Sequence, residues 1–283
     1  MPDIDLRGCS IHYEIDDFAA PWKPSEVVLI QHGVGRSGRF FHHWVPYLAG
    51  DYRVVRRDMR GHGQSSDPGR DYVWNAEDLL LDMLAFLDAL KLDRVHYIGE
   101  SAGGVLGLAF AARFPERLHS LTVCSSPFAL PHARLDNLVK ATGHKNMGNA
   151  LDNMPIADWV RANLQTGSLT TLGPDHTRWI IAEWEKNPVH VLKGIIGMLP
   201  SVDLSEMLPK IAVPTLLLCP ARSMLTTPRE QTKMRDMIPL GRMEVIDGSG
   251  HEIYVDQAPA CIAAIKTMWE SIPRMARRAS QNG

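Results

Sequence analysis

Short apolar runs alternate with longer amphipathic segments along most of the chain. The runs are typical of strands buried on both faces of a sheet, and they lie at residues 27–31, 53–57, 95–99, 121–125, 215–219 and 243–246. Residues 75–90 carry Leu79, Met83 and Leu87 on one side of a helical pattern, which predicts a helix with one apolar face. The alternation predicts an α/β fold with a mostly parallel, doubly wound sheet.

The alternation stops after Pro127 and resumes near Val213. The segment between them shows helical patterns at 156–164, 174–185 and 189–198, and it is too apolar to be a disordered linker. We therefore predict an α/β core made of residues 1–127 and 210–273, with a helical insertion at 128–209. Residues 274–283 carry three arginines among small and polar residues, and we predict a disordered tail there.

The strongest chemical signal is Gly99-Glu100-Ser101-Ala102-Gly103, between a predicted strand and a helix rich in small residues. A sharp strand-to-helix turn needs glycine on both sides, because the helix backbone comes close to the strand. Such a turn holds the serine hydroxyl above the sheet at a helix N-terminus, where developing negative charge is stabilised. We predict that Ser101 is a nucleophile and that Glu100 packs beside the turn.

A second glycine-rich loop, Gln31-His32-Gly33-Val34-Gly35, follows the first predicted strand. Acyl transfer needs two N–H donors aimed at the oxyanion, and the residue after the nucleophile supplies only one. We expect the backbone N–H groups of Val34 and Ala102 to form this oxyanion hole. His32 is expected to support the loop.

The general base is expected after the last predicted strand, where the sequence reads Gly248-Ser249-Gly250-His251. A histidine on such a loop suits a group that must accept and return a proton, because an unperturbed imidazole titrates near pH 6.5. We predict that His251 is the base for Ser101.

These motifs, with Asp58-Met59-Arg60-Gly61-His62-Gly63-Gln64-Ser65 and in this order, resemble the α/β-hydrolase family. The resemblance covers nearly the whole chain apart from the insertion, which lies where that family carries its cap domain. It implies a serine hydrolase that needs no metal and no cofactor, and it makes Asp58 and His62 structural. Enol-lactone hydrolases and the hydrolases of ring-cleavage products both resemble the chain. The motifs identify the fold far better than the substrate.

The substrate that we favour is a small ester or lactone. Arg36 lies just past the oxyanion loop, and we expect it at the mouth of the pocket as a contact for a substrate anion. A carbon–carbon bond hydrolase stays open as an alternative.

The chain departs from the family pattern at the acid that orients the base. That acid usually follows Pro-Thr-Leu-Leu-Leu as Gly-x-x-Asp, and here Ser223 stands at its position. The other usual position, at residues 123–127, also lacks a carboxylate.

Three explanations are open. A Ser–His dyad could rely on a backbone carbonyl or on the hydroxyl of Ser223, Ser125 or Ser126. A carboxylate from elsewhere, such as Asp247, Glu252 or a cap residue, could take the place of the acid. Finally, the chain could be a non-hydrolytic member of the fold: a cofactor-free oxygenase, a lyase or a ligand receptor.

The composition of the chain indicates which kinds of binding partner and which cellular compartment to expect. The net charge of -2 gives no general attraction to nucleic acid or anionic membranes, and no segment approaches the roughly 18 apolar residues of a membrane span. The four cysteines are scattered, which is typical of buried thiols in a reducing compartment. We expect a soluble, cytoplasmic enzyme with a small-molecule substrate and no nucleic-acid or membrane partner. A homo-oligomer stays open.

Overall fold

The computed structural model describes residues 2–139, 142–248 and 250–272, so the predicted tail at 274–283 lies outside the described residues. One sheet holds eight strands in the order β1-β2-β4-β3-β5-β6-β7-β8. From β4 to β8 all neighbours are parallel, whereas β2 is antiparallel to both β1 and β4. The strands are β1 (Asp3–Leu6), β2 (Cys9–Asp16), β3 (Val27–Gln31), β4 (Arg53–Arg57), β5 (Val95–Glu100), β6 (Leu118–Cys124), β7 (Thr215–Pro220) and β8 (Gly241–Ile246).

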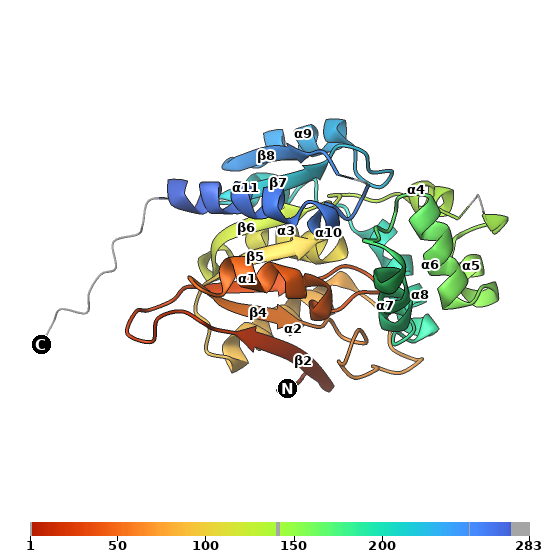
Figure 1. Ribbon diagram of the computed structural model, residues 1–283, viewed down its shortest axis with the longest axis horizontal. Coiled ribbons are helices and arrows are strands. Elements are labelled where there is room, and N and C mark those ends of the chain that lie inside the picture. Colours follow the sequence, from red (N-terminus) through yellow and green to blue (C-terminus); the bar gives the residue numbers. More distant parts are fainter. Residues whose placement is uncertain (1, 140–141, 249, 273–283) are drawn as a thin grey trace, which may run out of the picture.

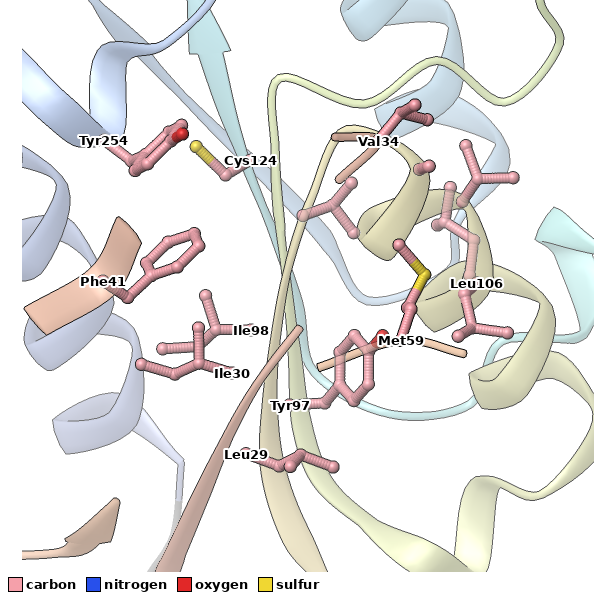
Figure 2. Close-up of a cluster of buried hydrophobic side chains, with 14 of the residues drawn as sticks. Leu29, Ile30, Val34, Phe41, Met59, Tyr97, Ile98, Leu106, Cys124 and Tyr254 are labelled. Atoms are coloured by element: carbon pink, nitrogen blue, oxygen red, sulfur yellow. The ribbon is translucent and has the colours of Figure 1, made fainter. Parts of the chain in front are cut away.

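Helices cover both faces of the sheet, as predicted. In Figure 1, α1 and α11 lie on one face, and α2, α3 and α9 lie on the other. Neighbouring residues of β3 and β5 point to opposite faces, so Ile30 and Ile98 lie toward Phe41 while Leu29 and Tyr97 lie on the other side (Figure 2). The core helices are α1 (Val45–Leu48), α2 (Ala76–Ala89), α3 (Ala102–Arg113), α9 (Pro228–Met237), α10 (Ile253–Asp256) and α11 (Ala258–Ser271), and a 3₁₀ helix, η1, spans Gly38–Trp44.

The segment between β6 and β7 is helical and lies at one end of the molecule (Figure 1). Trp184 packs so closely on Gly35 that a Cβ atom at residue 35 would overlap its ring. The inserted helices therefore lie directly against the loop that follows β3. They are α4 (His132–Asn137), α5 (Met147–Asn153), α6 (Ile156–Gln165), α7 (Pro174–Trp184) and α8 (Val189–Met198).

Among the elements that the sequence pattern did not predict are the strands β1 and β2 and the short helices α4 and α5. β1 and β2 form the antiparallel edge of the sheet, where polar residues, exposed in β1 and mostly half-buried in β2, interrupt the apolar runs that mark a central strand. No helix in the described ranges is both long and apolar enough to cross a membrane.

Candidate active site

Ser101 lies in a strained turn between β5 and α3. Its backbone has φ 50° and ψ −117°, a conformation that residues other than glycine rarely adopt. A Cβ atom at residue 99 would overlap the backbone of Gly103, and one at residue 103 would overlap the backbone of Gln31. The glycines are therefore needed for the close approach of helix and strand, as predicted. The turn leaves Ser101 partly exposed at the helix N-terminus.

His251 connects Ser101 to Ser223. The Nε2 atom of His251 lies 3.3 Å from Ser101 Oγ, and its Nδ1 atom lies 3.1 Å from Ser223 Oγ. The N–H of His251 donates to the carbonyl of Gly167 in the inserted segment (3.1 Å), which holds the loop in place. The structure thus brings Ser101 and His251 together and puts a hydroxyl where the family places a carboxylate.

The other candidates for the missing acid lie elsewhere. Asp247 is exposed and pairs with Arg222 (2.9 Å), and Ser126 Oγ donates to the carbonyl of Cys124 (3.0 Å). The carboxylate of Glu252 is buried against Arg36. Ser223 is the group that these distances place against Nδ1 of His251.

The Ser223 hydroxyl also accepts hydrogen bonds from the N–H groups of Leu225 (3.1 Å) and Thr226 (3.2 Å). These two bonds occupy both lone pairs of the oxygen, so its own O–H is the group left for His251 Nδ1. We therefore assign the proton of neutral His251 to Nε2, which faces Ser101. A base needs the opposite tautomer, with Nε2 free, and Ser223 has no free lone pair to stabilise it. Ser223 thus orients the ring and offers its Nδ1 atom a donor, not an acceptor.

The loop after β3 lies beside Ser101. His32 accepts from the N–H of Met59 at Nε2 (2.9 Å), so its Nδ1–H donates to the carbonyl of Gly33 (2.7 Å), which gives it the predicted supporting role. Within the described part of the chain, neither the N–H of Val34 nor that of Ala102 donates to a protein acceptor. Ala102 is the first residue of α3, where an N–H has no partner inside the helix.

Asp58 has the structural role that the resemblance implies. Its carboxylate accepts from the N–H groups of Gly38 (2.7 Å) and Gln64 (2.9 Å) and so ties η1 to the loop after β4. His62 is fully buried, with Nδ1 3.0 Å from the carbonyl of Arg60.

Arg36 lies inside the protein, at 5% exposure, and not at the mouth of a pocket. Its guanidinium donates to Glu252 Oε1 through Nε (2.7 Å) and to the carbonyl of Val34 through Nη1 (2.8 Å). The expectation of a contact with a substrate anion therefore finds no support in this position. The physical reason is that two buried carboxylates, Glu252 and Glu100, surround the guanidinium and attract it inward.

Glu100 packs beside the turn as predicted, but its surroundings are unusual. Its Oε2 atom accepts from the N–H of Gly33 (2.8 Å) and lies 3.9 Å from Arg36 Nε. Its Oε1 atom is buried, has no hydrogen-bond donor among the described residues, and lies 3.9 Å from His251 Nε2.

Burial controls the charge states of these groups. Burial raises the pKa of Glu100 to about 7, against the opposing effect of Arg36. Burial, followed by the nearby Arg36 charge, lowers the pKa of His251 to about 3, so the ring is neutral at pH 7. The sequence analysis missed this Arg36–Glu100–Glu252 cluster, although each member lies within two residues of Val34, Ser101 or His251.

Known proteins resemble this chain in sequence and in structure. A family described as the alpha/beta hydrolase fold matches residues 26–258. A Caulobacter vibrioides (strain NA1000 / CB15N) protein, provisionally named carbamate hydrolase RutD, is 30% identical over 85% of this chain and 88% of its own length. The 3-oxoadipate enol-lactonase 1 of Acinetobacter baylyi is 28% identical over 73% of this chain and 76% of its own length.

The meta-cleavage product hydrolase of Pseudomonas fluorescens IP01 has a similar solved structure. Its TM-score is 0.75 at 18% identity, with 95% of this chain and 97% of that chain covered, which shows a shared fold. The relatives are named as hydrolases, so the prediction of a hydrolytic enzyme is confirmed. The match over residues 26–258 shows that this chain belongs to the alpha/beta hydrolase fold family.

Proposed function

We propose that the chain hydrolyses a small carboxylic ester or lactone through an acyl-enzyme on Ser101. The observation that carries this proposal is the 3.3 Å approach of His251 Nε2 to Ser101 Oγ at a strained strand-to-helix turn. A serine hydroxyl next to a histidine on such a turn is the arrangement of an activated nucleophile.

In the proposed reaction, Ser101 Oγ attacks the carbonyl carbon of the ester while its proton passes to Nε2 of the appropriate tautomer of His251. The oxyanion accepts hydrogen bonds from the N–H groups of Val34 and Ala102. The C–O bond then breaks, and His251 returns the proton to the leaving alkoxide. Water attacks the acyl-enzyme with His251 as base, which releases the acid and restores Ser101.

An ester or lactone is favoured because a weakened base suits a good leaving group. An alkoxide leaves more readily than an amine, so its departure depends less on proton transfer from His251. The name of the enol-lactonase relative points to the same class of bond. The buried, unpaired state of all four cysteines supports a reducing, cytoplasmic location as part of the proposal.

The test is labelling with a fluorophosphonate probe, followed by turnover of a panel of esters, lactones and amides. We expect one label on Ser101 and many turnovers of at least one ester or lactone. Ser101→Ala should abolish both, whereas Ser205→Ala, a serine at an exposed turn, should change neither. Saturable binding with no more than one turnover per chain would favour a ligand receptor, and consumption of oxygen with an aromatic substrate would favour an oxygenase.

A further inference from the structure

We propose, on the basis of the hydrolase function above, that Glu100 supplies the negative charge that the missing triad aspartate would provide. It does so from the Nε2 side of His251. Glu100 is a positioning residue in this proposal, because it acts on the proton affinity of His251 and not on the substrate.

The first support is the difference between the groups that lie next to the two ring nitrogens of His251. On the Nδ1 side, Ser223 offers a neutral hydroxyl whose lone pairs are already used. On the Nε2 side, Glu100 Oε1 lies 3.9 Å away with no donor among the described residues. A buried polar atom without a partner is costly, and such atoms are found where function requires them.

The second support is the balance of buried charge. When both carboxyl groups are ionised, Glu100 and Glu252 share one cation, Arg36, so the buried cluster has an excess of one negative charge. Proton transfer from Ser101 to His251 creates an imidazolium beside this cluster. The excess charge is then neutralised within a medium of low polarity, which favours the protonated ring.

Ionised Glu100 is required, so the proposal predicts a pH dependence. The charged and titratable groups that face Glu100 are Arg36 after β3, Cys124 at the end of β6, and His251, Glu252 and Tyr254 after β8. Burial places the pKa of Glu100 within the range of an ordinary assay. The ratio kcat/KM should therefore rise with pH as Glu100 loses its proton.

A purely structural role would be to hold the loop through the N–H of Gly33. Glu100→Gln separates the two roles, because the amide oxygen can still accept from Gly33 while the charge is gone. Glu183→Gln is the matched control. Glu183 is also buried and paired with cations, but it lies on α7, and its partners are Arg39 and Lys186.

The experiment compares kcat, KM and pH profiles of these variants on the ester found in the turnover panel. We expect Glu100→Gln to lower kcat by at least about 10-fold, which is less than the about 10⁴-fold loss caused by removing a triad aspartate. KM should not change, and kcat/KM should no longer rise with pH. Adding Ser223→Asp to Glu100→Gln should restore most of kcat, because a second carboxylate then serves the ring. Glu183→Gln should match the wild type.

Equal kcat values and pH profiles for Glu100→Gln and the wild type would overturn this inference and leave the hydrolase function intact. A low kcat that Ser223→Asp does not restore would also overturn it, because the loss would then be structural. A wild type that neither takes the probe nor turns over any substrate would overturn the hydrolase function, and this inference with it.

Discussion

Ser223→Asp is the substitution for which the structure makes the sharpest prediction. An aspartate here would accept from Leu225 and Thr226 as the serine does, and it has further lone pairs for the Nδ1–H of His251. The substitution therefore changes the favoured tautomer to the one with Nε2 free. It also places a negative charge beside a ring whose pKa burial and Arg36 lower to about 3.

The magnitude follows from the geometry. Two unit charges about 4 Å apart interact by roughly 4 kcal/mol at an effective dielectric constant of 20, which corresponds to about 10³-fold in rate. Part of this is offset by the cost of burying a carboxylate at residue 223, where the serine is 8% exposed. We expect kcat/KM to rise by roughly 10- to 100-fold.

The assay is kcat/KM on one ester from pH 4 to pH 9, with Ser223→Asn as the uncharged control of similar size. The added charge raises the pKa of His251 above about 3, so protonation of the ring should begin to lower kcat/KM at the acidic end of this range. Ser126→Asp should give no gain, because Ser126 contacts the carbonyl of Cys124 and not the ring. If Ser223→Asp is no faster than Ser223→Asn, the tautomer and charge at Nδ1 do not limit the reaction and the reasoning is wrong.

Three further predictions concern stability. Arg36→Met should lower the free energy of unfolding by about 3–5 kcal/mol in urea titrations, because Glu252 loses its buried cation; no loss would contradict the pairing. Gly35→Ala should lower the melting temperature more than Gly8→Ala does, because both glycines have similar positive φ angles but only a side chain at residue 35 would overlap Trp184. Equal decreases in melting temperature would refute this. The raised pKa of Glu100 stabilises the fold below pH 4.5, and this contribution is lost as pH rises through about 7. From pH 4 to pH 8, the free energy of unfolding of the wild type should therefore fall by up to about 3 kcal/mol more than that of Glu100→Gln. An equal change in both proteins would contradict the raised pKa.

The central strands could be predicted from the sequence because burial on both faces leaves a continuous apolar run. The bounds 27–31 and 53–57 agree with β3 and β4 at both ends. The antiparallel pair β1 and β2 could not be predicted in this way, because alternating polar residues break the apolar run. The α6, α7 and α8 helices were predicted within one residue at each end, since each begins at or next to a proline.

The site was predictable where its chemistry is local in the sequence. Ser101 and His251 are recognisable because the glycines around them serve the turn and the loop that carry them. Ser223 was recognised as one candidate partner of the base, and the structure places it there. The prediction put Arg36 at the mouth of the pocket because its actual partner, Glu252, is 216 residues away in the sequence, and no local pattern reveals a pair so far apart.

The location of the buried cluster accounts for the proposed role of Glu100 in place of the missing acid. The loops after β3, β5, β7 and β8 all leave the same edge of the parallel sheet, so residues distant in sequence meet around His251. A carboxylate next to Ser101 can then approach the imidazole from one side when the position after β7 carries only a hydroxyl. The electrostatic requirement is negative charge near the ring, and the convergence of these loops allows more than one residue to meet it.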